Sequence, residues 1–331
     1  MDDAKIIQHI DENIAKNFFK RKYEGTGQDM LFVHSMFYTL QGEMPYAGRP
    51  CLFIRLAGCN RGAKVGMDCE GCDTEFSLAK GTDWTPDALA AKAMTLLEEN
   101  NAFDATLQEP MIVITGGEPM LQSFGLALFI ASLYDRFSDL KLMRETYSGM
   151  KLTIQFETNG DIAPYPGMLI PMNIDLSEIQ DKEVAKSVAF DVADKNSWWP
   201  HLKLAFVISP KGRLNVTSLV ERVKTFKPNQ SVPNTYVKVF LRRLVSGNSE
   251  SVYYGNTLEQ LKETVHLSNY PLDGIFLSPV TYYKTAFTNF ADASKSVDEE
   301  KSKEAIKRCM SLCQQHGFSM SWQTHVYLNI E

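Results

Sequence analysis

Short apolar segments alternate along the chain with longer segments that mix apolar and polar residues. The short segments predict strands at residues 51–57, 111–115, 151–157, 202–208, 236–241, 274–277 and 319–323. The longer segments predict helices at residues 85–100, 120–137, 214–226, 257–267 and 298–315, the first with Thr85 as N-cap and Pro86 as its first residue. Strands and helices that alternate in this way are typical of a parallel α/β sheet or barrel.

Three segments do not fit this alternation of strands and helices. The sequence contains no internal repeat and no low-complexity tract. We expect residues 1–28 to form a helical extension and residues 29–331 to form one core domain. The connections 161–200 and 279–297 are long and carry no clear element, so we interpret them as insertions, the first as an insertion or a lid.

Composition and charge exclude several classes of function. With 44% hydrophobic and 22% charged side chains, the 331 residues have the composition of a soluble globular protein. A net charge of −6 argues against a nucleic-acid-binding surface that works by charge alone. The longest apolar segment, 126–134, is too short to span a membrane, and the N-terminus has no apolar signal core, so we expect a cytoplasmic protein. In that reducing compartment the six cysteines should be thiols or metal ligands.

Polar motifs follow the predicted strands at the points where the strands end. They are 59-CNRGAKVGMDCEGCDT-74, 116-GGEP-119, 157-ETNG-160, 209-SPKG-212, 278-SP-279 and 323-QTH-325. Sites in parallel α/β sheets and barrels lie at the carboxyl ends of the strands. We therefore expect these motifs to converge on one site.

Cys59, Cys69 and Cys72 lie in one loop, the last two in a CxxC step. A closed zinc site or an iron–sulfur cluster takes four thiolates, so three leave one coordination position for a small chelating cosubstrate such as an amino acid. The rival is structural zinc with Cys51 as fourth ligand, but the strand between Cys51 and this loop spans ~20 Å at about 3.3 Å per residue. Cys309 and Cys313 share a helix face and suit a second metal site, although two thiols alone more often pack as apolar residues.

These motifs together resemble those of the radical S-adenosylmethionine (SAM) enzymes, and more narrowly of the 7-carboxy-7-deazaguanine synthase family of queuosine and 7-deazapurine biosynthesis. The matching segments are 38-YTLQGEMPYAGRPCLFIRLAGCN-60, 71-GCDTEF-76, 113-VITGGEPMLQ-122, 157-ETNG-160, 207-VISPKG-212, 277-LSP-279 and 323-QTH-325. Nine residues separate Cys59 from Cys69 where radical SAM enzymes commonly have three, and Met44 replaces the second glycine of a GEG motif. The resemblance implies a partial, open TIM-like (β/α)6 barrel of the radical SAM type.

The resemblance also implies an activity. It is the conversion of 6-carboxy-5,6,7,8-tetrahydropterin to 7-carboxy-7-deazaguanine with loss of ammonia, through a 5′-deoxyadenosyl radical. The implied cofactors are a [4Fe–4S] cluster, SAM and Mg²⁺. The implied partners are a flavodoxin-like or ferredoxin-like electron donor and a second copy of the chain in a homodimer, with no nucleic acid and no membrane.

Roles for single residues follow from the same resemblance. Cys59, Cys69 and Cys72 would ligate the cluster, and Thr74 would ligate Mg²⁺, whereas Asp73 also suits a turn cap. The residues expected to bind cofactor are Gly71, Asp73, Gly116, Gly117, Glu118, Glu157, Asn159, Ser209, Pro210, Lys211, Leu277, Ser278 and Pro279. The residues expected to bind substrate are Leu40, Gln41, Gly42, Glu43, Arg55, Thr115, His325 and the terminal carboxylate of Glu331, six residues beyond His325.

Two alternatives remain open at this stage. One is another radical SAM enzyme, such as an activase that makes a glycyl radical on a partner protein. The other is a non-catalytic regulator that keeps the fold and binds a partner through residues 1–28 or 161–200.

Overall fold

The computed structural model describes most of the expected core and both ends of the sheet. The described residues are 30–60, 81–104, 108–143, 149–165, 168, 202–209, 223, 235–240, 258, 274–282, 284 and 297–324. The predicted extension 1–28 lies outside them, as do most of the connections 161–200 and 279–297.

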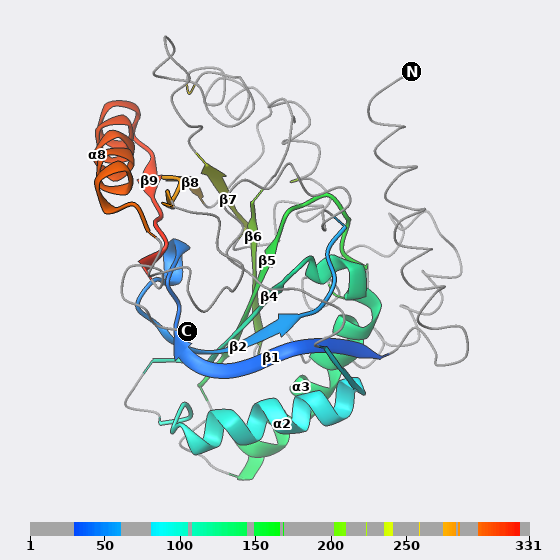
Figure 1. Ribbon diagram of the computed structural model, residues 1–331. Coiled ribbons are helices and arrows are strands. Elements are labelled where there is room, and N and C mark those ends of the chain that lie inside the picture. The colour runs from blue at the N-terminus through cyan, green and yellow to red at the C-terminus, as the bar shows by residue number, and fades with distance from the viewer. Residues whose placement is uncertain are drawn as a thin grey trace.

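One nine-stranded sheet organises these residues (Figure 1). Its strands are β1 Leu31–Leu40, β2 Pro50–Leu56, β3 Thr82–Trp84, β4 Met111–Gly116, β5 Leu152–Thr158, β6 Leu202–Ile208, β7 Thr235–Phe240, β8 Gly274–Ser278 and β9 Ser319–Met320. The strand order is β3-β1-β2-β4-β5-β6-β7-β8-β9. Every pair from β2 to β9 is parallel, whereas β1 runs antiparallel to both β2 and β3. The predicted α/β class is confirmed.

The helices begin and end at recognisable caps. They are the 3-10 turns η1 Met44–Tyr46 and η4 Pro119–Gln122 and the α-helices α2 Pro86–Glu99, α3 Ser123–Met143 and α8 Glu299–His316. As predicted, the Thr85 hydroxyl caps α2 by accepting a hydrogen bond from the Ala88 amide. Gly317 ends α8 in the left-handed conformation that a glycine adopts without strain. Figure 1 places α2 and α3 together near the β1 end of the sheet and α8 beside β9.

The two faces of the sheet have different chemistry because successive side chains of a strand point to opposite faces. On the face that packs against the helices, alternate residues such as Ile54, Ile114, Phe156 and Val237 are fully or almost fully buried in the main core. Their neighbours point to the other face. That face, here called the polar face, carries Arg55 on β2, Thr115 on β4, Gln155 and Glu157 on β5 and Lys238 on β7.

Most predicted elements lie within two residues of their expected bounds, but two strands were missed and one helix starts differently. The sequence pattern did not predict β1 or β3, which form one end of the sheet. The helix predicted from residue 120 begins as the turn η4, and α3 then continues to Met143. The predicted helices 214–226 and 257–267 lie outside the described residues except for Val223 and Leu258, which are helical and buried. Within the described part of the chain, no helix is both long and apolar enough to cross a membrane.

Candidate functional site

The loop after β4 packs directly on the loop that leads to Cys59. The amides of Gly117 and Glu118 donate hydrogen bonds to the carbonyl oxygens of Leu56 (3.1 Å) and Gly58 (2.9 Å). A Cβ atom on Gly117 would lie 1.9 Å from the Gly58 carbonyl oxygen and 2.9 Å from Cys59 Cβ. Only a glycine therefore fits at position 117, and its lack of a side chain brings the backbone up to the first cysteine.

The Glu118 carboxylate joins the loop after β4 to the end of β5. The side chain is fully buried, and its oxygens accept hydrogen bonds from the Met120 amide (2.9 Å), the Thr158 hydroxyl (2.7 Å) and the Asn159 amide (2.8 Å). A carboxylate that accepts three internal hydrogen bonds is held in one position. Glu118 is thus a predicted cofactor-binding residue whose carboxylate has these three partners within the protein.

Asn60 connects the cysteine loop to the same end of β5. Its Oδ1 accepts a hydrogen bond from Asn159 Nδ2 at 2.8 Å, and its Nδ2 donates to Asp161 Oδ2 at 3.1 Å. The Cys59 sulfur lies 3.9 Å from the same Asn60 oxygen, and Cys59 itself is partly exposed. The sequence analysis gave Asn60 no role. Its one signal was its place directly after the first cysteine.

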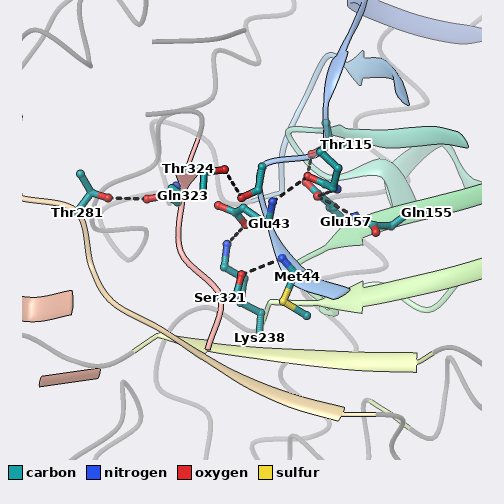
Figure 2. A network of polar contacts seen from close by, with 12 residues as sticks. Glu43, Met44, Thr115, Gln155, Glu157, Lys238, Thr281, Ser321, Gln323 and Thr324 are labelled. Carbon is teal, nitrogen blue, oxygen red and sulfur yellow. Dashed lines mark hydrogen bonds and ion pairs between the residues drawn. The ribbon is translucent and has the colours of Figure 1, made fainter. Parts of the chain in front are cut away.

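Glu157 is the centre of a second cluster, on the polar face (Figure 2). It accepts hydrogen bonds from the Thr115 hydroxyl (2.9 Å), Gln41 Nε2 (3.1 Å) and Gln155 Nε2 (3.0 Å). Burial raises the pKa of the Glu157 carboxyl above its usual value, and the nearby Glu43 carboxylate raises it further. The cluster unites Gln41, Thr115 and Glu157, which the sequence placed in three separate motifs.

Glu43, in the loop after β1, forms an ion pair with Lys238 on β7 (Figure 2). Glu43 is 8% exposed and Lys238 only 5%, so both charges are almost withdrawn from water. The sequence analysis missed Lys238 although a lysine inside the apolar strand 236-YVKVFL-241 was a signal. It also missed Gln155, which shares a strand face with Glu157 because two positions separate them.

The segment after β9 also forms hydrogen bonds with the loop after β1. The Met44 amide donates a hydrogen bond to the Ser321 hydroxyl at 3.0 Å, and the Thr324 hydroxyl donates one to the Gly42 carbonyl oxygen at 2.7 Å. Figure 2 shows Ser321, Gln323 and Thr324 arriving beside Glu43 and Met44. The loop 41–44 is thereby held by β5, β7 and the C-terminal segment together.

Arg55 lies on the polar face, paired in the sheet with Thr115 of β4. Its guanidinium carbon sits 4.8 Å from the centre of the Phe37 ring, and that ring stacks on Phe53. Among the described residues, no carboxylate lies within ion-pair distance of this guanidinium. A guanidinium supported by an aromatic ring in this way can form two parallel hydrogen bonds to a carboxylate.

The remaining described candidates lie at strand ends. The Ser209 amide donates a hydrogen bond of 2.7 Å to the Thr158 carbonyl oxygen, which places the end of β6 beside that of β5. Leu277 and Ser278 are fully buried at the end of β8 and are followed by buried Pro279, whereas the Leu40 side chain is 44% exposed.

Several predicted site residues fall outside the described part of the chain. They are Cys69, Gly71, Cys72, Asp73, Thr74, Pro210, Lys211, His325 and Glu331. Within the described residues, no group of three His, Cys, Asp or Glu side chains could hold a metal ion. Cys51, Cys309 and Cys313 are buried in the two apolar clusters. Burial raises the pKa of the Cys51 thiol, and the hydrogen bond with Cys313, together with burial, raises the pKa of the Cys309 thiol. The packing of Cys309 and Cys313 matches the apolar alternative considered for them from the sequence.

Comparison with known proteins identifies relatives over part of the chain. The curated 7-carboxy-7-deazaguanine synthase of Chlorobaculum tepidum is 41% identical over 108 residues, 32% of this chain and 40% of that protein. The synthase of Rhodospirillum rubrum is 32% identical over 150 residues, 44% of this chain and 50% of that protein. The synthase of Hyperthermus butylicus is 33% identical over 138 residues, 41% of this chain and 46% of that protein.

Over these segments the chain is similar to 7-carboxy-7-deazaguanine synthases. It matches about half of the length of these relatives or less, and no family model matches it. The crystal structure of QueE from Escherichia coli aligns with 89% of this chain and 95% of its own, at 17% identity and a TM-score of 0.44.

Proposed function

We propose that the chain is a radical SAM 7-carboxy-7-deazaguanine synthase, which converts 6-carboxy-5,6,7,8-tetrahydropterin to 7-carboxy-7-deazaguanine with loss of ammonia. The hydrogen bond from Gln41 to Glu157 supports this most, since it joins two of the motifs that carry the family resemblance across 116 positions. The names of the curated relatives support it independently.

The cysteine loop suits the cofactors of this reaction. Cys59 is partly exposed beside the side-chain-free Gly117, and Cys69 and Cys72 would supply the other two thiolates of a [4Fe–4S] cluster. When bound, the cluster and SAM supply the one-electron chemistry that starts the rearrangement. The chain would hold SAM through the backbone around Gly117, through Glu157, Asn159, Ser209 and Lys211, and through the segment 277–279, and Mg²⁺ through Thr74.

In this proposal the loop after β4 binds the amino group of SAM. The Gly117 and Glu118 amides and the Glu118 carboxylate already bond within the protein. The SAM amino group would be bound by the Glu118 carboxylate, whose two oxygens have four acceptor positions, together with carbonyl oxygens of this loop.

The polar face provides partners for a pterin that carries a carboxylate. The pterin ring offers N–H donors along one edge, and the side chains of Gln41 and Glu43 offer oxygen acceptors within one cluster. Arg55 would pair with the carboxylate in a bidentate fork. His325 and the terminal carboxylate of Glu331 would complete the site.

We propose further that the six parallel strands β2, β4, β5, β6, β7 and β8 form the partial (β/α)6 barrel of this enzyme class. The unbroken parallel pairing of these strands supports the proposal. One core domain 29–331 with a helical extension, a cytoplasmic location, a homodimer and a flavodoxin-like or ferredoxin-like electron donor belong to the same proposal.

The test is a reaction with purified protein. The protein is reconstituted anaerobically with iron and sulfide and incubated with SAM, reductant, Mg²⁺ and 6-carboxytetrahydropterin, and products are identified by mass spectrometry. We expect 7-carboxy-7-deazaguanine from the wild type and none from Cys72→Ala. Cleavage of SAM without this product would reject the substrate and leave another radical SAM activity, and a protein that retains no iron would reject the enzyme class.

A further inference from the structure

Lys238 is a buried cation that the activity proposed above does not use. It lies in β7 between Val237 and Val239, which are both fully buried in the main core on the helix-packed face. Lys238 therefore points to the polar face, where it is 5% exposed. A lysine is almost never buried to this extent without a partner, because desolvation of the ammonium is costly.

Lys238 forms an ion pair with Glu43, which lies 195 positions earlier in the chain. Glu43 is connected onward through its neighbour Gln41. The Glu43 amide donates a hydrogen bond to Gln41 Oε1 at 3.2 Å, and Gln41 Nε2 donates to Glu157 Oε1 at 3.1 Å. A continuous polar connection therefore crosses the sheet from β7 to β5 through the loop after β1.

The positive charge of Lys238 also offsets the negative charges of two nearby carboxyl groups. Glu43 and Glu157 are carboxylates that lie close enough for the charge of Glu43 to raise the pKa of Glu157, and the charge of Lys238 acts in the opposite direction. Without Lys238, two carboxylates would face each other on a buried surface with no cation from β7. The Glu43 carboxylate and the loop 41–44 that carries it would then lose the ion pair that holds them to β7.

We infer that Lys238 is a positioning residue of the substrate site. Its ammonium holds the Glu43 carboxylate and, through Gln41, the acceptor array that receives the N–H donors of an aminopyrimidinone ring. The inference rests on the proposed function. A lysine that merely fastened β7 to the loop would stabilise the fold without affecting substrate affinity.

Four variants and a control separate these two roles. Lys238→Met removes the cation, Lys238→Arg keeps it, Glu43→Gln removes the partner charge, and Lys238→Met/Glu43→Gln removes both charges. The control is Lys303→Met on α8, whose ion pair with Glu299 is 3.4 Å long and exposed on both sides. Each reconstituted protein is measured for its iron content, thermal unfolding, KM and kcat for 6-carboxytetrahydropterin, and SAM cleavage without pterin.

We expect Lys238→Met to raise KM for 6-carboxytetrahydropterin by about tenfold or more, with iron content unchanged. Lys238→Arg should recover most of the affinity. The double variant should recover thermal stability relative to Lys238→Met but not substrate affinity, and Lys303→Met should match the wild type.

The inference is overturned if Lys238→Met lowers thermal stability while KM stays at the wild-type value. The ion pair would then stabilise the fold without positioning the substrate site. It is also overturned if the double variant recovers KM together with stability. Wild-type protein that neither binds nor converts the pterin would instead reject the proposed function, and with it the substrate role of Lys238.

Discussion

The Glu118 carboxylate accepts a hydrogen bond of 2.8 Å from the backbone amide of Asn159. The side-chain amide of Asn159 in turn donates to Asn60, the residue directly after Cys59. The loops that follow β2, β4 and β5 are therefore one hydrogen-bonded unit. A disturbance at Glu118 should reach the cysteine loop through this unit.

Replacing Glu118 by alanine tests this unit. The change leaves the Met120 amide, the Thr158 hydroxyl and the Asn159 amide without their acceptor, and each unpaired buried group costs about 1–3 kcal/mol. We expect the free energy of unfolding to fall by about 3 kcal/mol or more, as measured by urea denaturation. The matched control is Glu304→Ala, which removes an exposed carboxylate from α8 and should change stability by about 0.5 kcal/mol or less. Equal losses in the two variants would contradict the role of Glu118.

Alanine substitutions at Gly117 and Gly149 test the close contact between the loop after β4 and the loop after β2. A Cβ at Gly117 would meet the Gly58 carbonyl oxygen at 1.9 Å, whereas a Cβ at Gly149 would meet nothing within 4 Å. Gly117→Ala should therefore lower the free energy of unfolding by about 2 kcal/mol or more, since backbone must move to admit the methyl group. Gly149→Ala should stay within about 0.5 kcal/mol of the wild type in the same urea titration. The account fails if Gly117→Ala is as stable as Gly149→Ala.

Glu157 should give the stability of the protein a dependence on pH. Its pKa is raised in the folded state, so the folded protein holds this proton more tightly than the unfolded chain does. Stability should fall as the pH rises from about 4.3, the usual value for glutamate, through the raised folded pKa, and should then level off.

Glu157→Gln should remove this fall. A glutamine oxygen can still accept from Gln41 and Gln155, and the Thr115 hydroxyl can turn to accept from the new amide. The free energy of unfolding of Glu157→Gln, relative to that of the wild type, should therefore increase with pH. Urea denaturation at a series of pH values measures both free energies. Parallel pH curves for the two proteins would refute the assignment of this titration to Glu157.

Arg55 should recognise the carboxylate of the substrate. Arg55→Met keeps an apolar side chain against Phe37 and removes the charge, which should weaken pterin binding by ~2–5 kcal/mol. A pterin without the 6-carboxylate should bind the wild type and the variant equally weakly in isothermal titration calorimetry. If Arg55→Met lowers the affinity for both pterins by the same factor, Arg55 does not bind the carboxylate.

The sequence predicted the strands in which apolar residues predominate, such as β4 and β6, because most of their side chains are buried. It missed β1, in which His34 and Ser35 interrupt the apolar residues, and β3, which is only three residues long. The pairing that makes β1 a strand is with β2, a contact that no local pattern encodes.

The candidate site was predictable as a set of motifs, but its internal contacts were not. Gln41 and Glu157 stood in motifs, yet their hydrogen bond depends on how the loop after β1 lies on the sheet. Lys238 is a single lysine in a strand, and its role can be recognised only from its ion pair with Glu43 in the folded protein. Both contacts are tertiary, so a single sequence cannot supply them.

The central claim is that the polar face of the sheet binds the pterin. The most direct test is a crystal structure of the iron-loaded protein with SAM and 6-carboxytetrahydropterin. The account predicts the pterin ring within hydrogen-bond distance of Gln41 or Glu43, and its carboxylate on the guanidinium of Arg55. A pterin bound away from these three side chains, with Glu43 and Lys238 still paired and untouched, would contradict it.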